Sequence, residues 1–164
     1  MTDEPEYRPP SAFLCSLIDD EPTLAGDAEA DARAATLIAL TQDADPANRD
    51  WALMLLAQSE RDDDATRAAL AAGMDDDHRD AAGEALIGVA IREPERALPR
   101  VAELLGEEGI DSLTIEAAAY VADPSLVPAL KEIRAELGGD DDLFDQILDE
   151  AIDCCTRGTP PEPL

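Results

Sequence analysis

The sequence is poor in aromatic residues. Its 164 residues include one Trp, two Tyr and two Phe, so that aromatics make up only 3% of the chain. The apolar residues are mostly Ala, Leu, Ile and Val, a composition that suits close packing of helices and disfavours a β-sandwich. Hydrophobic residues still reach 45% of the chain, which is enough to build the core of one domain.

Positive charge is scarce as well. The 12 Lys and Arg residues stand against 39 Asp and Glu residues, which gives a formal net charge of -27. Phosphate groups of nucleic acids and anionic membranes repel such a chain, so we expect no direct binding to either. The charge instead favours a protein partner with a basic surface. Salt adaptation would produce the same composition, and composition does not separate the two.

Cysteine and histidine are also few. Cys15, Cys154 and Cys155 predict no disulfide framework, because their number is odd and two are adjacent. They are typical of reduced thiols and predict a cytoplasmic location. The acidic first residues contain no apolar stretch of a secretory signal, and no run reaches transmembrane length. His78 is the only histidine and no spaced ligand motif is present, so we expect no metal, no cofactor and no catalytic site.

What the sequence does contain is a repeat. A pattern of Ile38-Ala39-Leu40, Asp45, Arg49-Asp50, Ala52 and Leu56 recurs 30 positions later as Ala68-Ala69-Leu70, Asp75, Arg79-Asp80, Ala82 and Leu86. A fixed period of this length, with helical apolar spacing on both sides of an acidic turn, indicates a helical solenoid. We therefore predict an all-α fold.

Apolar positions with a period near 3.6 predict a short capping helix after Ser11 and then four helix pairs. The pairs span residues 27–58, 62–91, 94–122 and 124–155. The run of Asp residues at 75–77 is predicted to start the second helix of its pair, and Asp45 is predicted to cap the helix that begins at Pro46. Three regions are predicted: a flexible acidic tail (1–10), a repeat domain (11–155) and a Pro-rich tail (156–164).

Apolar residues on the second helices are predicted to face the core. On the first of these helices Ala52, Leu55, Leu56 and Ser59 are predicted to share one face. On the next the inward face is predicted to hold Ala82, Ala85, Leu86 and Val89, which match the earlier set at the offset of 30 positions. Stacking of such amphipathic pairs buries a continuous core.

Two segments, Asp45–Ala52 and Asp75–Ala82, resemble the HEAT-repeat signature of an acidic turn followed by Arg and small residues. Residues 116–130 are similar to the junction between two such repeats. The resemblance covers about residues 27–155, and the compact form is similar to the HEAT-like repeats of phycobilin lyases. It implies a right-handed α-solenoid of about four HEAT-like helix pairs with a short N-terminal capping helix, acting as a binding scaffold. Lyase activity does not follow, because no Cys or His cluster supports it.

Acidic residues gather in the turns inside the predicted pairs, and equivalent turns of a solenoid line up along one edge. We call this edge the acidic ridge, and its residues are Asp43, Asp45, Asp75, Asp76, Asp77, Glu107, Glu108, Asp140, Asp141 and Asp142. One carboxylate per turn suffices to cap a helix, and runs of three exceed that need. The ridge is therefore a candidate surface for a basic partner. The alternative is a solvated edge.

Trp51 and Met54 lie one helical turn apart, off the predicted apolar stripe. Trp51 either packs over the neighbouring pair, which the burial habits of Trp favour, or anchors a partner on the concave face together with Met54. At the offset of 30 positions, their counterparts are Ala81 and Glu84. Arg49 and Arg79 are predicted to pair with Asp residues of neighbouring layers.

The sequence as a whole predicts a non-catalytic, monomeric protein–protein interaction module that presents the acidic ridge to a basic partner. Two alternatives remain. One is an acidic inhibitor or immunity-type protein that masks a basic surface. The other is an accessory enzyme of the lyase type, which a thiol or an acidic pocket in the folded chain would favour. A flat acidic edge would favour binding.

Overall fold

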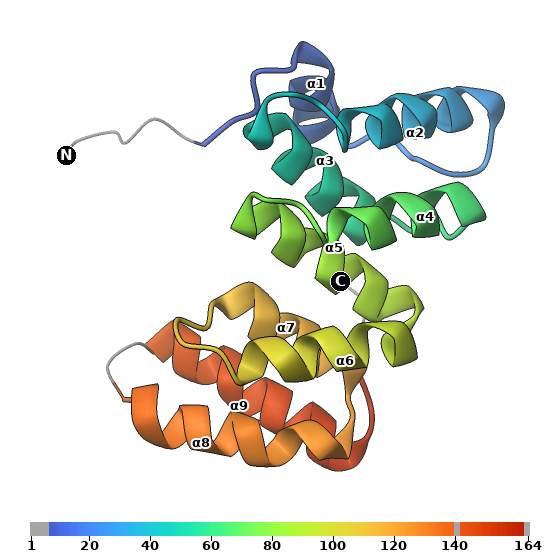
Figure 1. Ribbon diagram of the computed structural model, residues 1–164. Helices are drawn as coiled ribbons and strands as arrows, with labels where there is room; N and C mark the ends of the chain where they lie inside the picture. The colour runs from blue at the N-terminus through green and yellow to red at the C-terminus, as the bar shows by residue number, and fades with distance from the viewer. Residues whose placement is uncertain (1–6, 140–141, 163–164) are drawn as a thin grey trace.

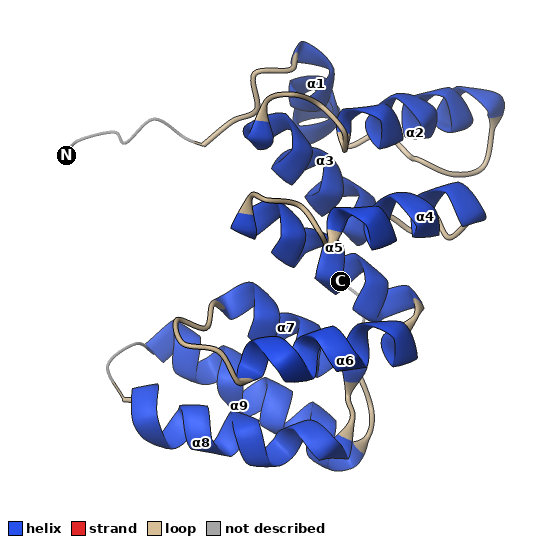
Figure 2. Cartoon of the chain, viewed as in Figure 1, coloured by secondary structure: helices blue, strands red, loops and turns tan. Residues whose placement is uncertain are grey.

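The computed structural model describes residues 7–139 and 142–162, and helices are the only regular secondary structure in this part of the chain (Figures 1 and 2). The predicted all-α fold is confirmed. No helix among the described residues is long and apolar enough to cross a membrane. The elements are α1 (Ala12–Asp20), α2 (Ala28–Leu40), α3 (Pro46–Gln58), α4 (Asp64–Gly73), α5 (Arg79–Arg92), α6 (Pro94–Leu105), α7 (Ser112–Val121), the 3₁₀ turn η1 (Pro124–Leu126), α8 (Val127–Leu137) and α9 (Asp142–Arg157).

Helices α3, α5, α7 and α9 form a central series in which each helix packs against the next. Helices α2, α4, α6 and α8 each precede a member of the series in the chain and pack against that member. Figure 1 shows these pairs descending from α2 and α3 at the top to α8 and α9 at the bottom. The helix pairs are those that the sequence predicts.

The first three helices of the central series, α3, α5 and α7, begin at regular intervals. The side chains of Asp45, His78 and Asp111 accept backbone N–H groups at the starts of α3, α5 and α7. Equivalent positions are therefore 33 residues apart (Asp45 to His78, and His78 to Asp111), and the predicted offset of 30 is wrong. Asp75 does not cap α5 because this helix begins only at Arg79. The run of Asp residues lies in the turn before the helix.

This register decides which apolar residues form the core. Leu53 and Leu86 are equivalent at the offset of 33, and both are buried, as is Leu56. The inward assignment of Ala52, Leu56, Ala85, Leu86 and Val89 agrees with the structure. Leu55 is half-buried but still packs against the core, whereas Ala82 is only half-buried.

Two glycines let α5 approach its neighbours closely. A Cβ atom at Gly88 would lie 2.6 Å from the Leu70 side chain and 3.0 Å from Ala57. A Cβ atom at Gly73 would lie 2.8 Å from that of Ala85. Because such contacts are shorter than carbon atoms tolerate, these positions require glycine for the observed spacing of α3, α4 and α5.

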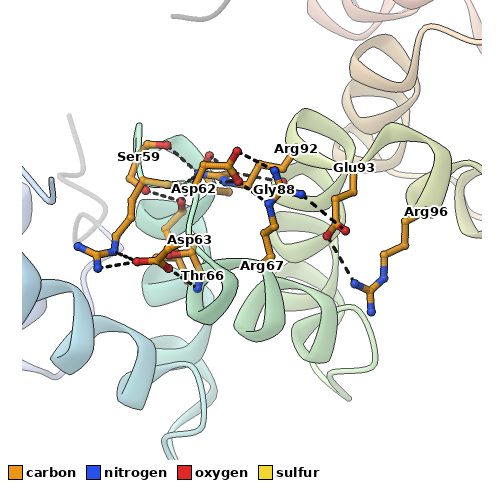
Figure 3. Close-up of polar contacts among 12 residues, drawn as sticks. Ser59, Asp62, Asp63, Thr66, Arg67, Gly88, Arg92, Glu93 and Arg96 are labelled. Atoms are coloured by element: carbon orange, nitrogen blue, oxygen red, sulfur yellow. Dashed lines mark hydrogen bonds and ion pairs between the residues drawn. The ribbon is translucent and has the colours of Figure 1, made fainter.

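A buried arginine holds the end of α3 (Figure 3). Arg92, at the end of α5, has a side chain that is only 4% exposed. Its guanidinium donates hydrogen bonds of 2.7–3.2 Å to backbone carbonyl oxygens. These belong to Leu56, Ala57, Ser59, Arg61 and Gly88. The carbonyl groups that helix α3 leaves unpaired at its C-terminal end are thus satisfied by a side chain of the next helix pair.

The segment before α1 lies against α3. The Tyr7 ring stacks on Trp51 with a centroid distance of 5.9 Å, and its hydroxyl donates to Asp50 over 3.0 Å. Pro9 is buried, and the backbone N–H of Ser11 donates to the Asn48 side chain. Residues 7–10 of the predicted tail therefore contact the helices, and residues 1–6 lie outside the described residues.

Candidate functional site

The acidic turns are tied together by arginines. Arg49, on α3, donates to both carboxylate oxygens of Asp76 at 2.8 and 2.9 Å, and to Asp77 at 2.8 Å. Arg79, on α5, donates to Asp111 at 2.7 Å and to the carbonyl oxygen of Gly109. The turn before each helix is thus linked to the arginine of the preceding layer. The predicted pairing of Arg49 and Arg79 with Asp residues of neighbouring layers is confirmed.

These links occupy part of the acidic ridge. The Asp76 side chain is only 8% exposed, and the hydrogen bond from Arg49 holds its pKa below the usual range. Asp43 accepts the backbone N–H of Asp45 and the Asn48 amide, and these hydrogen bonds lower its pKa as well. Asp45 caps α3. These three carboxylates serve the turns of the fold itself.

Other ridge residues do face solvent. Asp75, Asp77, Glu107 and Glu108 are exposed. Asp140 and Asp141 lie outside the described residues, and Asp142 begins α9. In the described part of the ridge, some carboxylates thus accept hydrogen bonds within the fold and others are exposed to solvent.

Trp51 and Met54 are both half-buried on α3. Trp51 is stacked against Tyr7, so one of its faces packs within the chain, but against the segment before α1 and not over the neighbouring helix pair as the packing interpretation expects. At the offset of 33, the counterparts of Trp51 and Met54 on α5 are Glu84 and Ile87, and the counterpart of Met54 on α7 is Tyr120. The predicted counterparts Ala81 and Glu84 are therefore wrong by one helical turn.

This corrected register leads to a group of carboxylates that the sequence analysis missed. We call it the acidic stripe, and it consists of Asp50, Asp80, Glu84, Glu116 and Glu150. Its members come from all four helices of the central series and act electrostatically on one another. Within the described residues, the carboxylates of Glu84 and Glu116 make no hydrogen bond or ion pair. At Glu84 and Glu116, therefore, no positive side chain of the described residues pairs with the carboxylate.

Burial makes this charge costly. Desolvation raises the pKa of Glu84 from 4.5 to about 7, and the charges of Asp50, Glu116 and Asp80 add to the increase. Desolvation, with a contribution from Glu150, also raises the pKa of Glu116. Both effects disfavour the ionised carboxylate. A cation placed between Glu84 and Glu116 would offset both the desolvation and the repulsion between carboxylates.

The cost of this charge predicts how stability depends on pH. Below about pH 4.5 Glu84 is protonated in both the folded and the unfolded chain, whereas between 4.5 and 7 only the unfolded chain ionises it fully. Its contribution to the free energy of unfolding therefore falls as pH rises through this interval, and the loss is complete above about 7. We expect Glu84→Gln to raise the free energy of unfolding by about 1–3 kcal/mol near pH 8, and to change it little near pH 4. Urea unfolding of both proteins at the two pH values measures this, and a gain that is equal at both would contradict it.

The stripe borders a groove with a volume of about 820 Å³. Glu84 and Glu116 line it together with apolar side chains of Ile87, Ile91 and Tyr120. Arg92 also lies in the wall, but its guanidinium already donates to backbone carbonyls. The groove therefore combines apolar surface with negative charge.

Neither the two adjacent cysteines nor the histidine lines this groove. Cys154 and Cys155 are buried, and burial raises the pKa of Cys155 to about 11, which keeps it a thiol. His78 caps α5 by accepting the backbone N–H of Ala81. No cluster of three or more His, Cys, Asp or Glu residues suited to a metal ion occurs in the described part of the chain.

The described residues thus define an all-helical protein of successive helix pairs with an acid-lined groove. Comparisons with models of protein families and with curated proteins found no match. Among solved structures, the X-ray structure of YibA from Escherichia coli is similar, with a TM-score of 0.64 and 26% sequence identity. The match covers 79% of this chain and 46% of YibA, so the chain spans about half the length of that protein.

Proposed function

We propose that the helix pairs form a right-handed α-solenoid of HEAT-like repeats, with α1 as the capping helix. Three observations support it. The caps of α3, α5 and α7 recur every 33 residues, the central helices pack in series, and arginines link successive turns. Each pair then contacts only its neighbours, which is the defining property of repeat proteins.

We further propose that the protein is a non-catalytic, monomeric interaction module that binds a protein with a basic surface in the cytoplasm. The carrying observation is the acidic stripe, where Glu84 and Glu116 are half-buried without any cation from the described chain. Charge that destabilises the free protein and would be neutralised in a complex is typical of a binding surface. The exposed carboxylates of the acidic ridge add to the same long-range field and would speed association.

Removal of charge from the stripe tests this function. We expect the wild-type protein to retain basic proteins from a native lysate at low salt, identified by mass spectrometry, and the double variant Glu84→Gln/Glu116→Gln to retain about tenfold less. The matched control removes more charge, but from the ridge, through Asp75→Asn, Asp77→Asn, Glu107→Gln and Glu108→Gln. It is expected to have the smaller effect. A loss in the ridge variant alone would identify the ridge as the binding surface, and retention that neither variant changes would refute the proposed function.

The enzyme alternative has one feature in its favour, which is the acid-lined groove. Paired carboxylates of raised pKa can act as an acid and a base. However, a lyase that uses a thiol finds none here, since Cys154 and Cys155 are buried and Cys15 lies on α1. An inhibitor or immunity-type protein would use the same acidic surface, and the identity of the retained proteins would distinguish it from a scaffold.

A further inference from the structure

The groove, which is lined by α5, α7, the end of α3 and the loop after it, has a composition that suits one kind of occupant. Its apolar side is formed by Ile87, Ile91 and Tyr120, and its charged side includes Glu84 and Glu116. Ile91 is 41% exposed, so part of its hydrocarbon surface is open to a ligand in the groove. Neither side alone identifies a ligand. Together they fit a ligand that carries an apolar group next to a positive charge.

Resting on the proposed function, we propose that this groove binds an extended segment of the partner protein, with a Lys or Arg side chain placed between Glu84 and Glu116 and an adjacent apolar side chain covering Ile91, since Ile87 is itself only 5% exposed. A cation is expected because the carboxylates of Glu84 and Glu116 have no positive partner in the described chain. An apolar neighbour is expected because its contact with the exposed Ile91 removes hydrocarbon surface from water.

Other occupants fit the groove less well. A metal ion needs converging ligands, and none of the described residues form such a cluster. A polyamine would satisfy the carboxylates but would leave the exposed part of Ile91 in contact with water. A second copy of this chain would bring a surface of the same charge, since the formal net charge is -27. A volume of about 820 Å³ exceeds that of one side chain, which agrees with a short stretch of polypeptide.

Binding of a cation in the groove is coupled to the ionisation of Glu84. Burial and neighbouring carboxylates raise the pKa of Glu84 to about 7 in the free protein. A bound ammonium or guanidinium group would favour the ionised form and lower that pKa. Ionic and apolar contributions are therefore separable, one by changing Glu84 and Glu116 and the other by changing Ile91.

The test uses the full chain and three probes: a short peptide in which Leu and Lys alternate, the same peptide with Ser in place of Leu, and spermidine. We expect the Leu–Lys peptide to bind and to shift the methyl resonances of Ile87 and Ile91 in NMR titrations. Its dissociation constant should rise about tenfold in Glu84→Gln/Glu116→Gln and several-fold in Ile91→Ser. The Ser–Lys peptide should bind more weakly and should not respond to Ile91→Ser. Leu137→Ser, at an exposed leucine on α8, is the matched control and should leave binding unchanged.

Each contrary result has a definite meaning. Equal binding of spermidine or of the Ser–Lys peptide would show an acidic surface without apolar recognition, which overturns this proposal and leaves the proposed function standing. Retention of basic proteins from lysate that survives both groove variants but is lost in the ridge variant would do the same. A dimer in sedimentation experiments that Ile91→Ser dissociates would identify a second copy as the occupant. Thermal melts of each variant verify that the fold is intact.

Discussion

Arg92→Met should reduce the free energy of unfolding by about 3–5 kcal/mol. The substitution keeps the length and the apolar stem of the side chain but removes every donor. The carbonyl oxygens of Ala57 and Ser59 then lose the hydrogen bonds that Arg92 donates, whereas that of Leu56 still accepts from the backbone N–H and the hydroxyl of Ser59. Each buried acceptor left without a donor costs on the order of 1–3 kcal/mol, and water can replace only those at the edge. Urea unfolding at neutral pH measures the loss.

Two further variants separate the geometry of Arg92 from its charge. Arg92→Lys keeps the charge but cannot reproduce the planar fork of donors, so it should lose most of the same stability. Arg96→Met removes an arginine from the next helix, where the side chain is exposed and, among the residues that the structure describes, pairs with Glu93 alone. It should change the free energy of unfolding by less than about 0.5 kcal/mol. If Arg92→Met were no worse than Arg96→Met, the buried guanidinium would not hold α3 in place.

Much of the fold could be predicted from local sequence. Helices follow from apolar spacing, and their starts from Asp-Pro pairs such as Asp45-Pro46, because both signals act within one or two turns of the chain. The links from Arg49 and Arg79 to Asp residues were also predictable, since each layer carries both partners. Local sequence signals do not predict how one helix pair packs on the next.

The register between layers was the main error, and it has a physical reason. The similarity between Asp45–Ala52 and Asp75–Ala82 aligns two acidic runs, and therefore gives an offset of 30. The structure aligns the caps instead, and His78 takes the place that an Asp holds in the other turns. Because His is an uncommon cap, the sequence pattern favoured Asp75. A shift of three residues moves a side chain by nearly one helical turn.

The same shift hid the acidic stripe. Glu84 and Glu116 are single carboxylates among apolar residues, whereas the ridge consists of conspicuous runs. With the offset of 33, Glu84 aligns with Trp51, and Ile87 and Tyr120 align with Met54, so the face would have been found. The raised pKa values of its carboxylates could not have been predicted from the sequence, because desolvation depends on how α3, α5 and α7 enclose each carboxylate.

The ridge is the opposite case, because it is conspicuous in the sequence but part of it serves the fold. Three consecutive Asp residues at 75–77 suggest more charge than a cap needs, yet Asp76 is nearly buried against Arg49. A carboxylate in a surface run thus serves the fold, while isolated carboxylates within a helix are left without a cation. Charge that lacks a partner in the folded chain is a better guide to a binding surface than charge density along the sequence.

Leu56→Ala and Leu86→Ala should each lower the free energy of unfolding by about 2–5 kcal/mol, because both side chains are buried in the core between α3 and α5. The loss has two parts, namely the transfer of hydrocarbon to water and the cavity that rigid neighbours leave behind. Glycines at 73 and 88 already bring the helices to their closest approach, which limits how far the core can collapse into that cavity. Leu137→Ala, at a side chain that is 52% exposed, should cost well under half as much. Urea unfolding of the three variants compares them directly, and losses at Leu56 and Leu86 no larger than at Leu137 would mean that the central series does not share one core.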